Sequence, residues 1–314
     1  MANDSFVKKM MSLSPHIEMI IRRLYWFNIK WLSRYSRKSK KPASKSYEEV
    51  DYDAMAEFLK SEGVQEGRLL LIHSSFGPFK GRGKTASQII DFFLDMVGDG
   101  GTLAMPAMPK FKNTADKKNY LDADFSSQVY TYDVRKSKIK TGVLPLMLHN
   151  REGSVRSLHP INTMVAYGRL ANEIMRDNLS GYSPLACGEN SSWKKCLDND
   201  ALIIGMGLDL THSLTSIHIA EDIKCSEWPI KNWYLEKKFK IVDGDNVICK
   251  VLKERAPKWG ALHFAERTLC KDLISAGLLK SKRINGINVE IISLKELYLF
   301  LDRRNYNGYP YFWT

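Results

Sequence analysis

Apolar runs alternate with amphipathic segments along the chain from residue 46 onward. Runs bounded by turn residues predict buried strands at 68–75, 101–109 and 201–208. Apolar positions spaced three and four residues apart predict helices at 51–64, 85–98, 169–178, 213–223, 264–277 and 292–301. Residues 237–252 alternate polar and apolar positions, which predicts more exposed strands. The order of elements favours a single layered α/β/α domain over residues 46–314, with a mostly parallel or mixed central sheet.

Residues 1–45 have a different character, with eleven of the 47 Lys and Arg residues but only two of the 35 acidic ones. Aromatic and aliphatic side chains, Trp26 and Trp31 among them, lie between these charges. No apolar run approaches the roughly 20 residues that span a bilayer, and Arg22 and Arg23 would interrupt a signal peptide. We interpret this part as a basic amphipathic segment followed by a linker.

Two interpretations of that segment remain open. In the first, it forms an interfacial helix, with its Trp and Tyr side chains at headgroup depth and its basic run against anionic lipid. In the second, the helix packs on the body of the protein or on a second copy in a homo-oligomer. The protein is expected to be cytoplasmic, and peripheral on the inner face of the membrane in the first case.

Composition excludes some classes of protein. A hydrophobic content of 44% in 314 residues is enough for a globular core. The net charge of +12 lies mostly in residues 1–45, so the nearly neutral remainder does not indicate a nucleic-acid-binding enzyme. The five cysteines form no Cys-x-x-Cys pair and are odd in number, which favours reduced thiols and no metal site.

The stretch GRGKT at residues 81–85 resembles the end of a nucleotide-binding P-loop. In that motif the first glycine stands five residues before the Gly-Lys pair, a position that Pro78 occupies here. A proline also lacks the N–H group that such a loop directs at phosphate. The motif therefore fails, and we do not expect an ATP site. A strand that ends in His73-Ser74-Ser75 before a glycine turn remains a plausible anion site.

Four short clusters carry candidate chemistry. They are His73-Ser74-Ser75, Thr141 to Pro145, Arg156 to Pro160, and Ile217 to Glu221. Each is weak alone, since a histidine before proline is often a satisfied turn residue and His-x-x-Glu is often a surface pair. Three residues apart on a helix, His218 and Glu221 would share one face.

In order and setting, these clusters resemble the aminoglycoside 3-N-acetyltransferase family, which is distinct from the GNAT acetyltransferases. The matching features are LLIHSS, VGDGGTLAMP, KTGVLP, RSLHP, AYG, the Ser183-Pro184 pair, LIIGMG and IHIAE. The resemblance covers residues 50–300 and implies transfer of an acetyl group from acetyl-CoA to an amine of an amino-sugar. The acceptor would be an aminoglycoside, or a nucleotide- or lipid-linked sugar destined for a surface polysaccharide. The alternative is a catalytically silent, membrane-associated member of the fold that acts as a scaffold.

The resemblance also implies roles for individual residues. The coenzyme A side would comprise His73, Ser74, Ser75, Phe76, Gly81, Thr141, Arg156 and Ser157. Acetyl transfer needs a base for the ammonium proton, and His159, His218 and Glu221 are the catalytic candidates. Neither a metal nor a redox cofactor is expected.

Three departures from the family pattern affect these roles. The Met-Pro-Thr signature of the family becomes Met105-Pro106-Ala107 here, which loses a hydroxyl. Family members place a further histidine shortly before the Ser-Pro pair, and the matching segment 176–184 has none. The segment before IHIAE is longer and adds His212. Either His212 or His159 would then do the work of the missing histidine.

Overall fold

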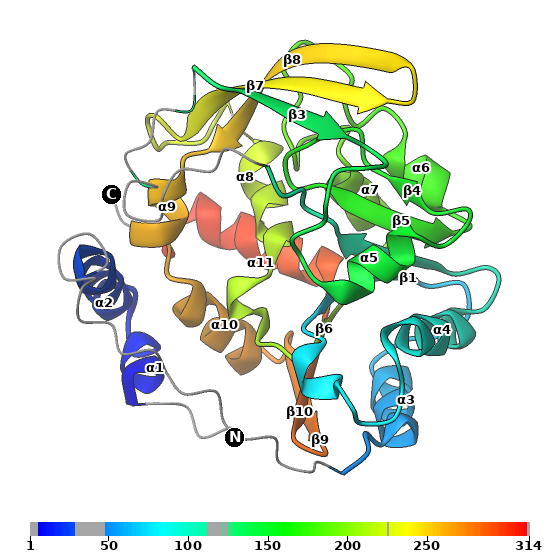
Figure 1. Ribbon diagram of the computed structural model, residues 1–314. Helices are drawn as coiled ribbons and strands as arrows, with labels where there is room; N and C mark the ends of the chain where they lie inside the picture. The colour runs from blue at the N-terminus through cyan, green and yellow to red at the C-terminus, as the bar shows by residue number, and fades with distance from the viewer. Residues whose placement is uncertain are drawn as a thin grey trace.

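A mixed sheet of seven strands forms the centre of the computed structural model, which describes residues 6–28, 48–111, 121, 125, 127–224 and 226–312 (Figure 1). The strand order is β4-β5-β2-β1-β6-β10-β9. The bounds are β1 Leu69–Ser74, β2 Thr102–Pro106, β4 Val155–Arg156, β5 Met164–Gly168, β6 Leu202–Met206, β9 Lys280–Ile284 and β10 Ile287–Ser293. The predicted α/β class with a mixed sheet is confirmed.

Strand β1 lies in the middle and runs parallel to β2 and β6. Its residues alternate between two hydrophobic clusters, with Leu69 and Leu71 in one and Leu70 and Ile72 in the other. A strand buried on both faces reads as a continuous apolar run, which explains why sequence analysis found β1, β2 and β6. The other four strands pair antiparallel with their neighbours.

Helices cover both faces of this sheet. One face carries α3 (Tyr52–Ser61), α4 (Ala86–Val97) and α5 (Val143–His149), whose apolar side chains join one cluster. The other cluster is completed by α6 (Ala171–Met175), α7 (Ser192–Asp198), α8 (Ile219–Asp222), α10 (Glu266–Ser275) and α11 (Leu294–Tyr306). The fold is therefore a three-layer α/β/α arrangement.

A second sheet of three strands lies over one end of the first (Figure 1). Strand β3 (Val129–Asp133) runs parallel to β7 (Tyr234–Asp243), which forms a hairpin with β8 (Asn246–Arg255). Phe239, Ile241 and Leu252 point inward and join the main core. Sequence analysis predicted strands in 237–252 but not β3, whose exposed face mixes apolar Val129 with polar Thr131, so that no clear alternation marks this short strand.

The expected helix at 213–223 is instead two short turns. A 3-10 turn, η5 (Thr215–His218), leads directly into α8. His218 and Glu221 nevertheless remain three residues apart along one turn. Sequence analysis also did not predict the β9–β10 hairpin, whose first strand is largely exposed and lacks a continuous apolar run.

The N-terminal segment forms two helices, α1 (Phe6–Met11) and α2 (Pro15–Phe27), beside α9 (Pro257–Leu262) and α10 (Figure 1). Glu18 of α2 is fully buried and accepts hydrogen bonds from the backbone N–H groups of Arg267 and Thr268, in the first turn of α10. Arg22 joins Glu18 to Glu266 at 2.9 Å from each carboxylate. Buried acidic residues are rare unless they are paired, so this contact attaches α2 firmly to the body.

The buried face of α2 packs on the body of the protein, which agrees with the second interpretation of the segment. The proposed linker and most of the basic run lie at 29–47, outside the described residues, and the boundary at residue 46 stays a prediction. Among the helices that the structure describes, none combines the length and the apolarity needed to cross a bilayer.

Candidate active site

The carboxyl ends of the parallel strands bring several of the predicted coenzyme residues together. His73 and Ser74 end β1, and the backbone N–H of Ser75 continues the pairing by donating to Met206 of β6 at 2.9 Å. Across from them, a side chain at Gly142 would lie 3.9 Å from the Ser74 carbonyl oxygen. Ligands of open α/β sheets bind at this edge, so the position of these residues suits a binding site.

Thr141 and Gly142 precede α5 and connect it to the end of β2. The Thr141 hydroxyl donates to the Pro106 carbonyl oxygen at 2.6 Å. Gly142 has a φ of 123°, which a residue with a side chain would adopt only with strain. The glycine of KTGVLP is therefore required by the turn.

His73 is buried, and its Nε2 atom has no hydrogen-bond partner among the described residues. Burial lowers the pKa of His73 to about 4, so the imidazole is neutral at physiological pH. Its ring lies 6.3 Å from that of Trp193, whose indole N–H donates to the Asn162 carbonyl oxygen at 2.8 Å. This contact connects the β1 end to the loop after RSLHP.

The loop that contains Gly81 comes after β1 and Phe76 in the chain. Gly81 is exposed with a φ of 73°, and the next residue, Arg82, is buried. The Arg82 guanidinium donates to the carbonyl oxygens of Glu48 and Asn285 at 2.7 and 2.8 Å. Arg82 thus holds the glycine turn against the β9–β10 hairpin.

Arg156 and Ser157 are buried in the RSLHP segment. The Arg156 guanidinium donates to the carbonyl oxygens of Ala107 and Ser137, each at 2.8 Å, and lies over the Tyr132 ring at 5.2 Å. Burial lowers the pKa of Arg156. These contacts fit a residue that holds three loops together, and the predicted place of Arg156 on the coenzyme A side stays a prediction.

His159 is also buried, with 3% of its surface exposed. Its Nδ1 atom lies 3.0 Å from the Ile161 carbonyl oxygen, and its Nε2 atom lies 3.1 Å from that of Pro184. Burial lowers the pKa of His159. Because backbone groups engage both ring nitrogens, His159 ties RSLHP to the Ser183-Pro184 segment.

His218 and Glu221 lie together in the wall of a pocket of about 280 Å³. The His218 Nδ1 atom is 2.9 Å from Oε2 of Glu221, and Arg255 of β8 lies 3.7 Å from the other carboxylate oxygen. An ionised carboxylate only accepts hydrogen bonds, so Nδ1 of His218 carries the proton and Nε2 keeps a free lone pair. A histidine oriented in this way is suited to act as a general base.

Asp222, which also lines this pocket, was missed by sequence analysis although it directly follows Glu221. Its carboxylate accepts from the Cys187 backbone N–H at 2.9 Å and from the Tyr234 hydroxyl at 2.7 Å. Burial raises the pKa of Asp222 to about 6. Arg255 was missed as well, because nothing local marks a residue that reaches the site from β8.

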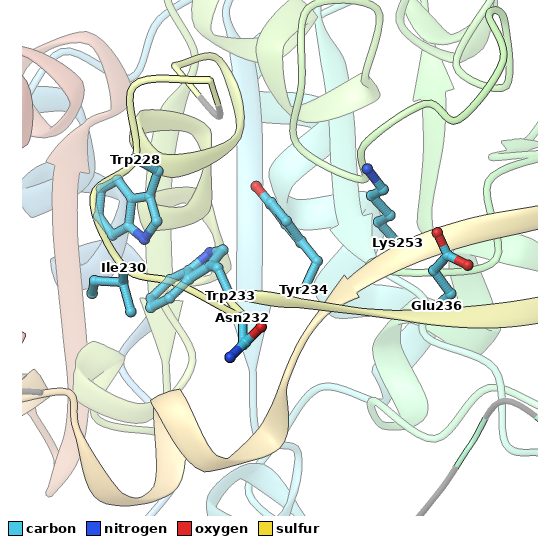
Figure 2. Close-up of a pocket in the computed structure, with 7 residues that line it drawn as sticks. All are labelled: Trp228, Ile230, Asn232, Trp233, Tyr234, Glu236 and Lys253. Carbon is cyan, nitrogen blue, oxygen red and sulfur yellow. The ribbon is translucent and has the colours of Figure 1, made fainter.

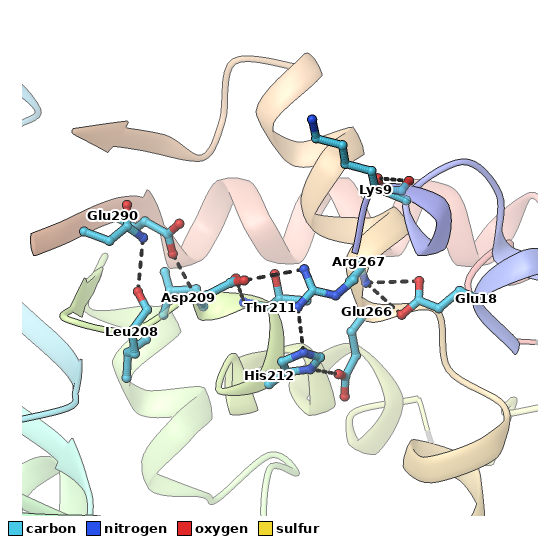
Figure 3. A network of polar contacts seen from close by, with 12 residues as sticks. Lys9, Glu18, Leu208, Asp209, Thr211, His212, Glu266, Arg267 and Glu290 are labelled. Atoms are coloured by element: carbon cyan, nitrogen blue, oxygen red, sulfur yellow. Dashed lines mark hydrogen bonds and ion pairs between the residues drawn. The ribbon is translucent and has the colours of Figure 1, made fainter. Parts of the chain in front are cut away.

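His212 lies in a different network, at the contact between η4 (Leu210–His212) and α10 (Figure 3). Its Nδ1 atom contacts the Glu266 carboxylate, and Arg267 donates to its Nε2 atom at 3.0 Å. Glu266 in turn binds Arg22 of α2. The additional histidine therefore belongs to the attachment of the N-terminal helices, and it is not a lining residue of the His218 pocket.

Comparison with known proteins agrees with these features. The family model described as aminoglycoside 3-N-acetyltransferase matches residues 71–304. The chain belongs to the aminoglycoside 3-N-acetyltransferase family. Within the part of the chain that the structure describes, no group of three or more His, Cys, Asp or Glu residues is arranged to hold a metal ion.

Several members of this acetyltransferase family are similar to the chain. Aminoglycoside N(3)-acetyltransferase III from Salmonella is 29% identical over 189 residues, which cover 57% of this chain and 62% of the relative. The chain thus spans less than two thirds of the length of the curated relatives it first matches. The crystal structure of aminoglycoside acetyltransferase AAC(3)-IIb and the solved structure of AAC-IIIb with CoASH share the fold, each with a TM-score of 0.66 over 82% of this chain and 97% of theirs, at 20% and 18% identity.

Proposed function

We propose that this protein transfers an acetyl group from acetyl-CoA to an amine of an amino-sugar. The observation that carries the proposal is the hydrogen bond between His218 and Glu221 in the wall of a pocket. Family membership supports the reaction, and a solved relative holds CoASH. The pocket is lined by three acidic side chains, Glu221, Asp222 and Glu254, and by two basic ones, Lys253 and Arg255. An aminoglycoside-like acceptor fits this excess of acidic residues, because amino-sugars are cations at neutral pH.

In this reaction the acceptor nitrogen forms a bond to the thioester carbonyl carbon, and the bond from that carbon to sulfur breaks. His218 accepts the proton from the amine through Nε2 and returns it to the sulfur of the departing CoA. Glu221 holds the ring through Nδ1 and stabilises the imidazolium that forms. Arg255 places a positive charge 3.7 Å from the carboxylate oxygen of Glu221 that does not contact His218.

For the coenzyme, the proposal assigns binding to the edge formed by His73, Ser74, Ser75, Phe76 and Thr141. Of these, His73 supplies the unpartnered Nε2 atom. Gly81, Arg156 and Ser157 support the same edge through the turns and loops they hold. His159 positions the loop in this proposal and His218 is the base, because the two ring nitrogens of His159 are already engaged.

The decisive experiment combines ligand binding with turnover. Acetyl-CoA and CoA are expected to raise the thermal midpoint and ATP is not, because only a ligand that prefers the native state stabilises it. Release of the CoA thiol should then depend on an added aminoglycoside. A midpoint shift with ATP that equals the shift with acetyl-CoA, or no thiol release with any amino-sugar, would contradict the proposal.

We further infer that the outer face of α1 and α2 rests on an anionic membrane surface. Val7 of α1, Leu13 of the turn between the helices, and Ile20 and Leu24 of α2 are each more than half exposed, whereas Glu18 and Met19 are buried. Arg23 is exposed beside Ile20 and Leu24, and a basic run follows at 30–45. An exposed apolar strip flanked by basic residues is typical of helices that lie in the interface of a bilayer.

The test uses the double variant Ile20→Ser/Leu24→Ser in the full chain. Binding to vesicles with anionic lipid should weaken about tenfold or more, since each buried aliphatic side chain contributes roughly 1.5–3 kcal/mol. Leu299→Ser, an exposed leucine of α11, is the matched control and should bind as the wild type does. Unchanged binding of the double variant, or a dimer in solution that the double variant abolishes, would overturn this inference in favour of the other interpretation.

A further inference from the structure

Helix α9 forms one wall of the His218 pocket. Pro257, Gly260 and Ala261 of this helix line the pocket together with His218 and Glu221. Helix α9 has only six residues, and a helix this short depends on tertiary contacts for its stability and its position. The contacts that hold α9 therefore set the shape of this wall.

On one side, Trp259 attaches α9 to the segment that leads into the second sheet. Its indole N–H donates to the Asn232 carbonyl oxygen at 3.0 Å, and its ring stacks on that of Trp233 with the centroids 5.5 Å apart. Figure 2 shows Asn232 and Trp233 next to each other, just before β7 begins. This side of the helix is thus held by residues that follow the candidate base in the chain.

On another side, α9 contacts α2 of the N-terminal segment. The Arg22 side chain is 13% exposed and lies 2.9 Å from both Glu18 and Glu266. Its guanidinium also donates to the Gly260 carbonyl oxygen at 3.4 Å. Arg22 precedes the residues that the family model matches, whereas α9 lies among them. This chain therefore supports a wall of the pocket with a helix from outside the matched part.

Gly260 also lies against Arg255. A β carbon at position 260 would come within 3.0 Å of a guanidinium nitrogen of Arg255, so the two residues are in close contact. Arg255 in turn lies 3.7 Å from one carboxylate oxygen of Glu221, and the other oxygen contacts His218 at 2.9 Å. A continuous series of contacts thus leads from Arg22 to the candidate base.

We propose that Arg22 is a positioning residue for the acceptor site and acts through Gly260 of α9 and Arg255. Without the contact to Gly260, α9 would shift relative to Arg255, and the wall of the pocket would fit the acceptor less well. This inference rests on the proposed function, because it takes the His218 pocket as the acceptor site. The coenzyme edge at the end of β1 contributes no residue to this series, so acetyl-CoA binding should not depend on Arg22.

The test uses Arg22→Lys, which keeps a positive charge between the two carboxylates but lacks the guanidinium fork that reaches three groups at once. The KM for an aminoglycoside should rise about fivefold or more, a typical coupling between sites, while the KM for acetyl-CoA should stay within about twofold. A smaller folded fraction would instead lower the apparent kcat and leave both KM values unchanged. This difference separates positioning from stability.

Lys271→Ala is the matched control for attachment of the N-terminal segment. Lys271 of α10 donates to the Ser12 carbonyl oxygen at 3.1 Å and makes no contact with the α9 wall among the hydrogen bonds of the described residues. Its loss should change neither KM. An aminoglycoside KM that stays at the wild-type value in Arg22→Lys, or that rises equally in Lys271→Ala, would overturn the inference.

A double-mutant cycle tests the part played by Arg255. If Arg22 acts through Arg255, the effect of Arg22→Lys on the aminoglycoside KM should be smaller in an Arg255→Lys background, because residues that share contacts are not additive. Effects that simply multiply would show that Arg22 does not act through Arg255 and would overturn the inference.

Hydrogen exchange separates this inference from the proposed function, because it needs no substrate. The amides of α9 and of His263, which donates to the Trp259 carbonyl oxygen, should exchange faster in Arg22→Lys than in the wild type. If exchange increases but the wild type shows no acetyl transfer, Arg22 positions α9 and the proposed function fails. If acetyl transfer occurs and exchange at α9 does not change, the proposed function stands and the inference fails.

Discussion

Nδ1 of His218 and Oε2 of Glu221 are 2.9 Å apart, although the two residues belong to different elements, η5 and α8. The continuous turn between these elements keeps both side chains on one face. Arg255, which reaches the same carboxylate from β8, joins the pair to the second sheet. The pair is thus held from two directions, as a base and its orienting group need to be.

His218→Ala should lower kcat for acetyl transfer by roughly 10²-fold or more, the typical contribution of a positioned base. The dissociation constant for CoA should stay within a few-fold, because His218 is expected to act on the amine. Steady-state kinetics and calorimetry of CoA binding measure the two quantities. His212→Ala serves as the control and should keep its kcat, since His212 contacts Glu266 and Arg267 instead. A fully active His218→Ala variant would move the base elsewhere.

His159→Ala should clearly lower the free energy of unfolding, whereas its effect on kcat should be small. Its ring is buried, with Nε2 donating to the Pro184 carbonyl oxygen and Nδ1 accepting from the Ile161 backbone N–H, so removing it should cost roughly 1–3 kcal/mol of the free energy of unfolding. Urea unfolding measures this cost, and kcat is compared at a temperature where the variant is folded. If folded His159→Ala that still binds CoA loses about 100-fold in kcat, then His159 is the base.

Two substitutions of Arg156 distinguish a phosphate contact from a support for loops. Arg156→Ala should weaken CoA binding with a smaller effect on kcat at saturation. An interaction that is equally strong in the ground state and the transition state contributes to binding and not to the chemical step. Arg156→Lys keeps the charge but cannot reproduce the fork that reaches Ala107 and Ser137. If the supporting role is correct, the two variants should lose similar affinity and similar stability. An Arg156→Lys variant with nearly normal affinity would favour a direct phosphate contact.

The raised pKa of Asp222 predicts a pH dependence of acceptor binding. Below pH 6 the carboxyl is protonated, so the KM for a cationic aminoglycoside should fall as the pH rises from 5 to 7 through the pKa of about 6. Asp222→Asn should remove this change in that interval. Because the folded-state pKa lies above the ordinary value of 3.8, the associated stability is complete below 3.8 and is lost as the pH rises through about 6. A wild-type KM that is flat between pH 5 and 7 would contradict the assignment.

Glu18→Ala should destabilise the whole protein and not only the N-terminal segment. Glu18 is fully buried, binds Arg22 and accepts two backbone N–H groups of α10, so its loss should cost roughly 2–4 kcal/mol. Deletion of residues 1–28 should lower the thermal midpoint for the same reason. Lys9→Ala, an exposed charge on α1, is the control and should have little effect. An unchanged midpoint after the deletion would mean that α2 is not needed by the fold.

The local pattern of residues in the sequence was enough to predict the central strands and to place part of the candidate site. Strands β1, β2 and β6 are buried on both faces, so each is a continuous apolar run that needs no tertiary information to find. His218 and Glu221 are three residues apart, and spacing along one turn already places them together. The family resemblance rested on the same short segments.

Only the tertiary structure shows which of these side chains already have backbone contacts and which line a pocket. His159 and His218 have the same side chain, yet contacts with Ile161 and Pro184 engage one of them while the other lines a pocket. Arg255 reaches Glu221, and Glu18 reaches Arg267, across 34 and 249 positions of the chain. Contacts over such separations depend on how strands pair and helices pack. Hydrophobic periodicity describes only the face that an element buries, and it does not specify the partner against which that face is buried.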